Sequence, residues 1–151
     1  PDWWKRLPFD TILTPHPGEM SVLTGLSIGE IQSDRWEVAR QYADRWGCVV
    51  VLKGALTVIA SPDGRFAVLP IATPALARAG TGDVLAGLIC GLRAQGVRAF
   101  EAAIAGAWIH GQAGLSACKT HGQPISVLAG DVLSAIPGVL KTMTESKKAG
   151  A

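Results

Sequence analysis

The chain has 151 residues, of which 48% are hydrophobic and 17% charged, whereas soluble domains typically carry about 25% charged residues. This balance predicts one domain with a sizeable core and excludes an intrinsically disordered chain. The net charge is only +2 with scattered lysines and arginines, and no apolar run reaches the ~18 residues that span a bilayer, so neither nucleic acid nor a membrane is expected as a partner.

The first part of the chain predicts short strands alternating with helices. The expected elements are a strand over 11–14, a helix over 19–23 with Pro17 in its first turn, and a helix over 36–46. Ser33 or Asp34 is expected to cap the longer helix, because a short polar side chain accepts a hydrogen bond from the first free amides. Gly47 is expected to end that helix.

A continuous apolar run over 48–52 predicts a strand buried on both faces, followed by a hairpin over 57–61 and 66–69 with a turn between. A loop over 70–79 leads to three expected helices, over 83–95, 99–117 and 129–140. This order predicts an α/β fold. The strands are few for so much helix, which predicts a partial domain or an obligate assembly. The absence of an initiator methionine fits the first alternative.

The three cysteines, Cys48, Cys90 and Cys118, are odd in number and far apart. They fit neither a disulfide framework nor a zinc site, so each is predicted to be a small buried residue in a reducing compartment. The first residues also lack the order of charge and apolar character that marks a signal peptide. A cytoplasmic location follows as the expectation.

A Gly-x-Gly turn runs directly into an expected helix at 79–87, Ala-Gly-Thr-Gly-Asp-Val-Leu-Ala-Gly. The first N–H groups of a helix have no partner within it and can bind an anion, and Gly80 and Gly82 let a phosphate approach the backbone. Asp83 then either accepts a proton from a hydroxyl that attacks phosphorus or simply caps the helix. The residues alone leave both interpretations open.

Lys53 follows the buried strand in Val-Val-Val-Leu-Lys-Gly-Ala-Leu-Thr, residues 49–57. Ligands in open α/β sheets bind beyond the carboxyl ends of the strands, which is where Lys53 is expected. A buried ammonium group is costly unless it reaches an anion or solvent. Taken alone, the position slightly favours a lysine at the sheet edge that extends into solvent.

His16 stands between two prolines in Thr-Pro-His-Pro-Gly-Glu, residues 14–19, and these prolines restrict the backbone around its imidazole. The alternative is an ordinary turn with a surface histidine. His110 and His121 have no comparable setting and are interpreted as structural or exposed. The five tryptophans are interpreted as packing residues, because no basic groove accompanies them.

In this order, the motifs at 14–19, 51–57 and 79–87 resemble those of the ADP/ATP-dependent NAD(P)H-hydrate dehydratases, which are ribokinase-like repair enzymes. The closing segment Ala-Gly-Asp-Val-Leu-Ser-Ala-Ile-Pro at 129–137 also resembles the last helix of that family. The His-Pro-Gly-Glu element distinguishes the group from sugar and vitamin kinases that share Gly-x-Gly-Asp. The resemblance implies a three-layer α/β sandwich with a largely parallel sheet.

The family usually has a longer N-terminal portion with a glycine-rich substrate loop, which has no counterpart here. Residues 1–144 therefore resemble the C-terminal part of the domain, and 145–151 are expected to form a flexible tail. Thr73 stands where the family often has asparagine. Leu56 stands where glycine is common, close to the expected adenine pocket.

The resemblance also implies roles for individual residues. Asp83 would be the catalytic base and, with His16, would contact the hydrated cofactor NADHX or NADPHX. The nucleotide, ADP or ATP, would be bound by Lys53, Gly54, Ala55, Leu56 and Thr57 and by the amides of Gly80, Thr81 and Gly82. Mg²⁺ is expected with the nucleotide; its ligands are not assigned, and Glu19 is only a weak candidate. A homo-oligomer is expected, with a tetramer as one option.

Two other functions stay open at this point. One is a small-molecule kinase of the same fold that acts on a vitamin precursor and releases a stable phosphorylated product. The other is a non-catalytic nucleotide-binding or assembly module, which the missing N-terminal portion suggests.

Overall fold

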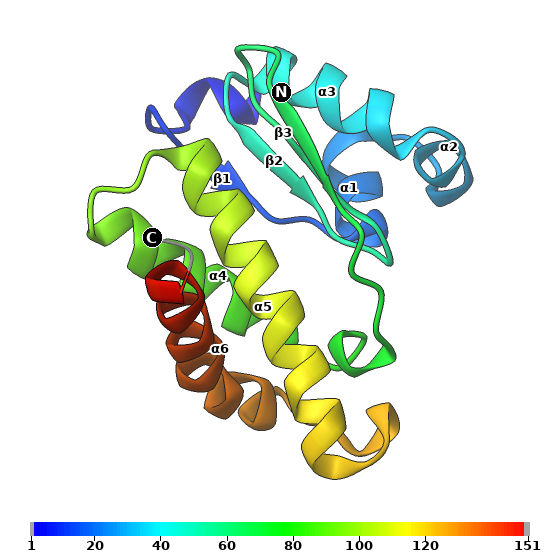
Figure 1. Ribbon diagram of the computed structural model, residues 1–151. Helices are drawn as coiled ribbons and strands as arrows, with labels where there is room; N and C mark the ends of the chain where they lie inside the picture. Colours follow the sequence, from blue (N-terminus) through cyan, green and yellow to red (C-terminus); the bar gives the residue numbers. More distant parts are fainter. Residues whose placement is uncertain (1, 150–151) are drawn as a thin grey trace.

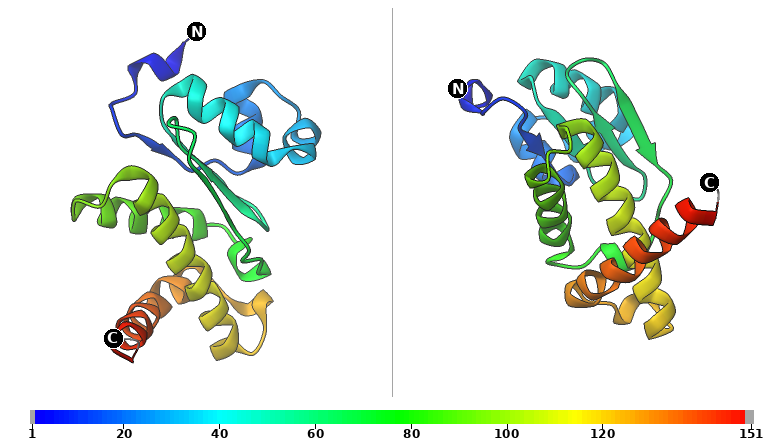
Figure 2. Two further views of the ribbon diagram at one scale, coloured as in Figure 1. Left: turned by 45° about the horizontal axis from the view of Figure 1, so that its top comes forward. Right: turned by 60° about the vertical axis from the view of Figure 1, so that its left-hand side comes forward.

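The computed structural model describes residues 2–149, and the side chains of residues 2–145. Four strands form one sheet in the order β1 (Ile12–Leu13), β2 (Val49–Leu52), β3 (Thr57–Ala60) and β4 (Phe66–Leu69). Helices cover both faces of this sheet, and Figure 2 shows it between α3 and α5. The chain is therefore an α/β structure of three layers, with a further helix, α6, beyond them (Figure 1).

The sheet is mixed, which differs from the largely parallel sheet that was expected. β1 runs parallel to β2, but β2 and β3 are antiparallel, as are β3 and β4. The physical reason is the length of the connections, because a parallel neighbour needs a crossover of a dozen or more residues. Only four residues, 53–56, connect β2 to β3, and five, 61–65, connect β3 to β4.

Three helices cover one face of the sheet: α1 (Pro17–Thr24), α2 (Ile28–Ser33) and α3 (Arg35–Trp46). They bury large side chains such as Met20, Ile31 and Trp46 against alternate residues of β2 and β3. A short 3-10 helix, η1 (Trp3–Arg6), packs against the same cluster, and the rings of Trp3 and Trp46 lie 5.1 Å apart. This contact confirms a packing role for these two tryptophans.

The opposite face carries α4 (Thr81–Ala94) and α5 (Ala99–His121). α5 packs against the sheet with small residues such as Ala102 and Ala103, which lets the helix lie close to the strands. Gly106 of α5 also meets Ile89 of α4 so closely that a Cβ there would stand 2.5 Å from Ile89 Cγ1. Close packing of small residues therefore defines this layer.

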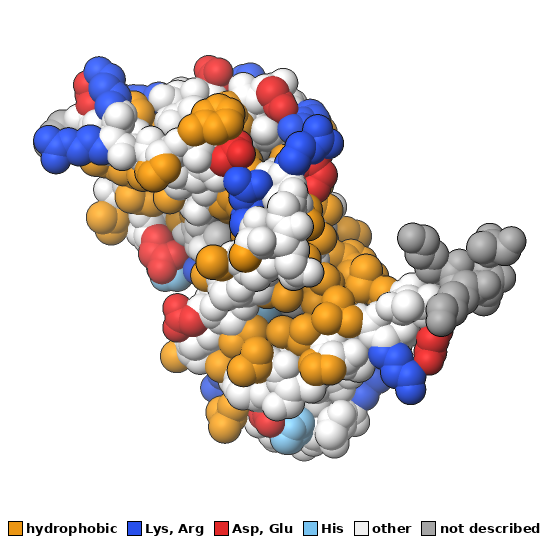
Figure 3. All heavy atoms as spheres, turned by 90° about the vertical axis from the view of Figure 1, so that its left-hand side faces the viewer, with side chains coloured by type: hydrophobic (Ala, Val, Ile, Leu, Met, Phe, Trp, Pro, Cys, Tyr) orange, Lys and Arg blue, Asp and Glu red, His pale blue; other side chains and the backbone are white. Residues whose placement is uncertain are grey.

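The last helix, α6 (Ala129–Ala149), packs on α4 and α5 away from the sheet. It leaves Leu133, Leu140 and Met143 exposed, and hydrophobic side chains gather across the middle of the face seen in Figure 3. The helix also covers residues 145–149 of the expected tail. The remaining two residues of that tail lie outside the described residues, so its flexibility stays a prediction.

Most expected elements are present with shifted ends. Asp34 caps α3 and Gly47 ends it with a left-handed backbone, as predicted. α2 and the short 3-10 helices were not expected, although Ser27 and Glu30 form the Ser-x-x-Glu capping pattern that marks a helix start. Among the described residues, no helix is long and apolar enough to cross a membrane.

The prediction for the cysteines is only partly correct. Cys48 is buried, and burial raises the pKa of its thiol to about 11. Cys90 is exposed and Cys118 is half-buried, so the expectation of three buried cysteines is wrong. Cys90 lines a small pocket between α4 and β1, together with Ile12 and Thr14.

Candidate active site

A cavity of about 1400 Å³ opens where the starts of α1 and α4 face the segment after β2. It brings together almost every residue that the sequence placed in the site: His16, Lys53, Gly54, Ala55, Thr57, Gly80, Thr81, Gly82 and Asp83. Leu56 is the exception. Its side chain is 50% exposed and does not line the cavity, so its predicted nucleotide contact has no support in this position.

The start of α4 lies in the wall of the cavity without a side-chain cap. Gly80 is the N-cap residue with φ +85°, a left-handed conformation that glycine adopts without strain. The hydroxyl of the buried Thr81 lies 2.8 Å from the carbonyl oxygens of Leu76 and Arg78, which fixes the turn before the helix. Of the predicted amides, that of Thr81 makes a long bond of 3.3 Å to Arg78, while that of Gly82 has no acceptor among the described residues.

Asp83 occupies the third position of α4 with an exposed side chain. Its carboxylate makes no hydrogen bond or ion pair with any residue that the structure describes, so it does not cap the helix. The helix dipole favours a negative charge at this position. Asp83 is therefore a free carboxylate at the edge of a helix start that has no side-chain cap.

Lys53 is held between the starts of α1 and α4. Its ammonium lies 3.3 Å from Glu19 Oε2, and a Cβ on Gly82 would stand 3.1 Å from Nζ. The side chain is only 24% exposed, which does not fit the alternative of a lysine that extends into solvent. The cation and the first turn of α4 together form the positive end of the cavity.

Arg35 supports the loop over 53–56, a role that no sequence pattern indicated. One guanidinium nitrogen, Nη2, donates to the carbonyl oxygens of Leu52, Lys53 and Leu56 at 3.0–3.2 Å. Gly54 makes room for this group, because a Cβ there would stand 2.5 Å from Nη2. Since these partners are up to 21 residues apart, no local pattern identifies the contact.

His16 and Glu19 form a capping box at the start of α1. The Nδ1 atom of His16 accepts the amide of Glu19 at 3.1 Å, and the carboxylate of Glu19 accepts the amide of His16 at 2.6 Å. Partial burial raises the pKa of Glu19, but the His16 amide and the Lys53 ammonium lower it more, so the net shift is downward. His16 is thus fixed at the cavity wall with its side chain 55% exposed.

The other two histidines differ from each other. His121 lies 3.3 Å from Asp131 at the far end of α5, as a structural or exposed histidine would. His110 is 7% exposed but lines the cavity from the middle of α5. His110 stands three residues after Ala107 and one before Gly111, so the three share one helix face, and this spacing was the pattern that could have placed His110 in the cavity wall.

The described residues contain no cluster of three or more histidine, cysteine or acidic side chains that could hold a metal ion. Glu19, the ligand suggested for Mg²⁺, is already engaged by Lys53 and the amide of His16. Asp83 is the free carboxylate nearest the start of α4.

The comparisons with known proteins agree with this geometry. A family model described as NAD(P)H-hydrate dehydratase matches residues 5–138. The bifunctional NAD(P)H-hydrate repair enzyme Nnr of Moorella thermoacetica is 48% identical over 134 residues, which cover 89% of this chain and 25% of that protein. The ADP-dependent (S)-NAD(P)H-hydrate dehydratase of Neisseria meningitidis is 43% identical over 89% of this chain and 46% of its own length.

Solved structures show the same relationship. The ADP/ATP-dependent NAD(P)H-hydrate dehydratase of Bacillus subtilis, co-crystallised with ATP and Mg²⁺, matches with a TM-score of 0.83 and 36% identity over 88% of this chain and 48% of its own. A ribokinase-like superfamily protein of Enterococcus faecalis matches with a TM-score of 0.74 and 27% identity, covering 91% of this chain and 46% of its own. The expected ribokinase-like fold is confirmed. The chain spans less than half the length of each of these relatives.

Proposed function

This chain belongs to the NAD(P)H-hydrate dehydratase family, and on that premise we propose that it carries the phosphoryl-transfer part of an enzyme that returns NADHX and NADPHX to NADH and NADPH. The observation that carries the proposal is the uncapped start of α4, with Lys53 beside it and the free carboxylate of Asp83 at its edge. Family membership also excludes the vitamin-precursor kinase, because the relatives are repair enzymes.

The roles follow from the charges around the cavity. The amides of Gly80 and Gly82 and the ammonium of Lys53 would hold the phosphoryl group, with a weaker contribution from the amide of Thr81, which already bonds to Arg78. The segment over 53–57, supported by Arg35, would line the nucleotide. His16 would contact the hydrated nicotinamide from the start of α1. Donors fixed in advance around the transferring group stabilise its charge in the transition state.

Asp83 would act as the general base. The substrate hydroxyl loses its proton to this carboxylate while its oxygen attacks the terminal phosphorus, and the bond to the leaving ADP (from ATP) or AMP (from ADP) breaks. The carbon–oxygen bond to the new phosphate then breaks and the neighbouring ring carbon loses a proton. The double bond of the reduced nicotinamide is restored and inorganic phosphate leaves.

Mg²⁺ fits this site only as a companion of the nucleotide. A magnesium ion at such sites usually has one or two carboxylates plus phosphate oxygens and water, and one free carboxylate, Asp83, is present here. When bound, the ion would neutralise charge on the phosphates. The residues that the structure describes do not form a dedicated metal site.

The test is turnover by the chain itself. Purified protein is incubated with NADHX, Mg²⁺ and either ADP or ATP while the absorbance of NADH is followed. The expected result is a rise in absorbance that depends on a nucleotide. ADP binding without any turnover would instead select the non-catalytic module, a second candidate that the partial coverage of the relatives supports.

We also infer a cytoplasmic location and small-molecule partners only, supported by three free cysteines and the absence of a membrane-spanning helix among the described residues. The homo-oligomer, including the tetramer, stays a prediction that sedimentation equilibrium tests. The exposed leucines of α6 and hydrophobic side chains in Figure 3 are compatible with such an assembly.

A further inference from the structure

His110 lies in the middle of α5, on the helix face that lines the cavity. Ala107, His110 and Gly111 follow each other at the spacing that places side chains on one side of a helix, and all three line the cavity. Gly111 brings the helix close to the loop after β4, because a Cβ there would stand 2.8 Å from Ile71 Cδ1. His110 is thus enclosed at the inner wall of the cavity and is only 7% exposed.

One ring nitrogen of His110, Nε2, has no hydrogen-bond partner among the described residues. Buried side-chain nitrogens are normally paired, because an unpaired one loses its hydration without compensation. Two other buried side-chain atoms in the described chain, Nε1 of Trp46 and Oε2 of Glu101, are also unpaired, but neither residue lines the cavity. The unpaired atom at the cavity wall therefore belongs to His110.

The same ring is connected to the first turn of α4. Burial lowers the pKa of His110 below its ordinary value of 6.5, a hydrogen bond with the backbone of Thr81 opposes this change, and the positive charge of Lys53 lowers the pKa further. The ring is therefore neutral at pH 7 in the free protein. A backbone contact that raises the pKa accepts a proton from the ring, which leaves Nε2 as the ring nitrogen without a partner.

The charges that face this ring come from few elements. Lys53 approaches from the segment after β2, and the other charged groups lining the cavity are His16 and Glu19 on α1, Arg78 before α4, and Asp83 on α4. Among these, only Lys53 contributes to the pKa of His110. The lining segment over 69–77, which packs against α5, carries no charged side chain.

We infer that Nε2 of His110 contacts the anionic group bound at the start of α4, and that the imidazole takes up a proton from solvent when that anion binds. The protonated ring donates from both nitrogens, one to the backbone of Thr81 and the other to an oxygen of the anion. His110 would then be a third cationic contact beside Lys53 and the α4 amides. This inference rests on the proposed nucleotide site and adds a residue to it.

The chain contains only three histidines, so nuclear magnetic resonance of the imidazoles can follow each of them. The probes are ADP and inorganic sulfate. Sulfate keeps a constant charge over the titrated pH range, whereas the terminal phosphate of ADP titrates within it. The expected result is an increase in the pKa of His110 by about one unit or more with either anion. His121, paired with Asp131 at the far end of α5, is the internal control and should not change.

His110→Gln assigns the resonance and supplies a second readout by calorimetry in two buffers with different heats of ionisation. With sulfate at pH 7, the wild-type protein should take up protons and His110→Gln should not. If ADP shifts the amide resonances of Gly80 and Gly82 while the pKa of His110 stays unchanged, this inference is wrong and the nucleotide site stands. If neither anion shifts those amides, the proposed nucleotide site and this inference both fail.

Discussion

The helices on the two faces of the sheet begin in different ways. α1, α2 and α3 each begin at a residue whose side chain accepts a backbone amide, namely His16, Ser27 and Asp34. On the other face, α4 and α5 begin at Gly80 and Arg98 without a side-chain cap. A side-chain cap satisfies one of the free amides of the first turn, whereas an uncapped start leaves all of them for solvent or a ligand.

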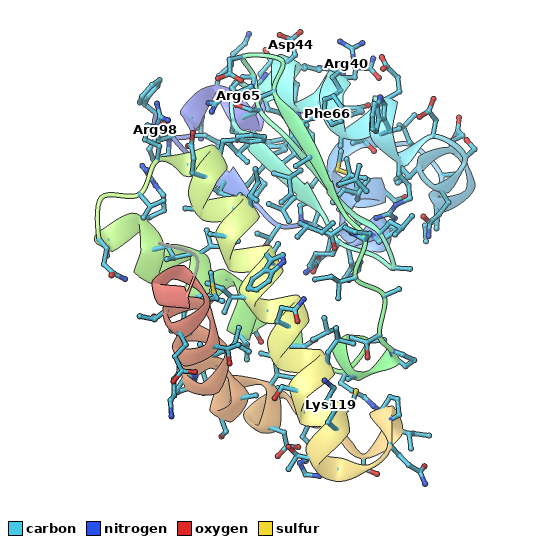
Figure 4. All side chains as sticks on the ribbon, viewed as in Figure 1. Arg40, Asp44, Arg65, Phe66, Arg98 and Lys119 are labelled. Atoms are coloured by element: carbon cyan, nitrogen blue, oxygen red, sulfur yellow. The ribbon has the colours of Figure 1, made fainter. Side chains whose placement is uncertain are left out.

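The two uncapped starts also differ in what surrounds them. Arg98 lies at the periphery of the molecule (Figure 4), and its guanidinium pairs with Glu101. Gly80 lies in the cavity wall, in the turn before α4. The ammonium of Lys53 lies close to Gly82 in the first turn of that helix. An uncapped helix start becomes a binding site only where the fold encloses it and places a cation nearby.

The largest expected effect comes from Asp83→Asn, which removes the free carboxylate from the open helix start. Turnover of NADHX should fall by about 10²–10⁴-fold, because the substrate hydroxyl loses its proton acceptor. ADP binding, measured by calorimetry, should change little. Asp44→Asn is the control, since Asp44 is exposed at the far side of α3 (Figure 4). Full activity in Asp83→Asn would remove the base from the mechanism.

Replacing Lys53, the cation beside the start of α4, should lower the affinity for the nucleotide and not only the rate of turnover. Lys53→Met is expected to lower ADP affinity by about tenfold or more, which corresponds to about 1.4 kcal/mol. The matched control is Lys119→Met, because Lys119 is exposed near the end of α5 (Figure 4). Equal ADP affinities in the two variants would show that Lys53 pairs with Glu19 and does not contribute to nucleotide binding.

The close packing of the α4–α5 layer can be tested with two glycines. Gly106→Ala should reduce the free energy of unfolding by about 1–3 kcal/mol, because its Cβ would overlap the buried Ile89. Gly87→Ala, on the open side of α4, should instead stabilise the protein by about 0.5–1 kcal/mol. Urea unfolding measures both. The same sign for both variants would contradict the packing described here.

Removing a cap on the face that carries α1, α2 and α3 should change the stability of the protein but not its affinity for ADP. Ser27→Ala removes the hydroxyl that accepts the amide of Glu30 and should reduce the free energy of unfolding by about 0.5–2 kcal/mol. ADP affinity should match that of the wild type, because α2 does not line the cavity. A loss of affinity would show that the two faces are coupled.

The smallest expected effect is the pH dependence that Glu19 contributes. Its pKa is lowered on folding from an ordinary value of 4.5, so its stabilising effect is complete above that value and disappears as the pH falls through the lowered pKa. Glu19→Gln keeps an acceptor for the capping box but loses the charge facing Lys53. The stability difference between the two proteins should therefore shrink in acid. A constant difference would exclude the ion pair as its source.

Local sequence patterns predicted much of the fold. Asp34 and Gly47 mark the ends of α3, the apolar run over 48–52 contains β2, and the Gly-x-Gly turn precedes α4. The capping pattern at Ser27 could also have identified α2. These successes share a cause, because caps, turns and hydrophobic runs depend on residues a few positions apart.

The site was predicted in its residue types more than in its contacts. The proximity of Lys53 to Glu19 and Gly82, and the three carbonyls bound by Arg35, join segments far apart in the chain. His110 was interpreted as structural or exposed because it has no setting comparable to the two prolines beside His16. Its position at the cavity wall depends on how α5 packs, which its own residues do not specify.

The sequence by itself determined most of the helices and strands and a few of their ends, such as Asp34 and Gly47 of α3, and it placed glycines, a lysine and an acid near two other ends. Only the tertiary structure decided that these ends share one cavity, that Leu56 lies outside it and that His110 lies within. The reason is that local geometry follows from backbone preferences and capping over a few residues, whereas the environment of a side chain depends on every segment that packs around it.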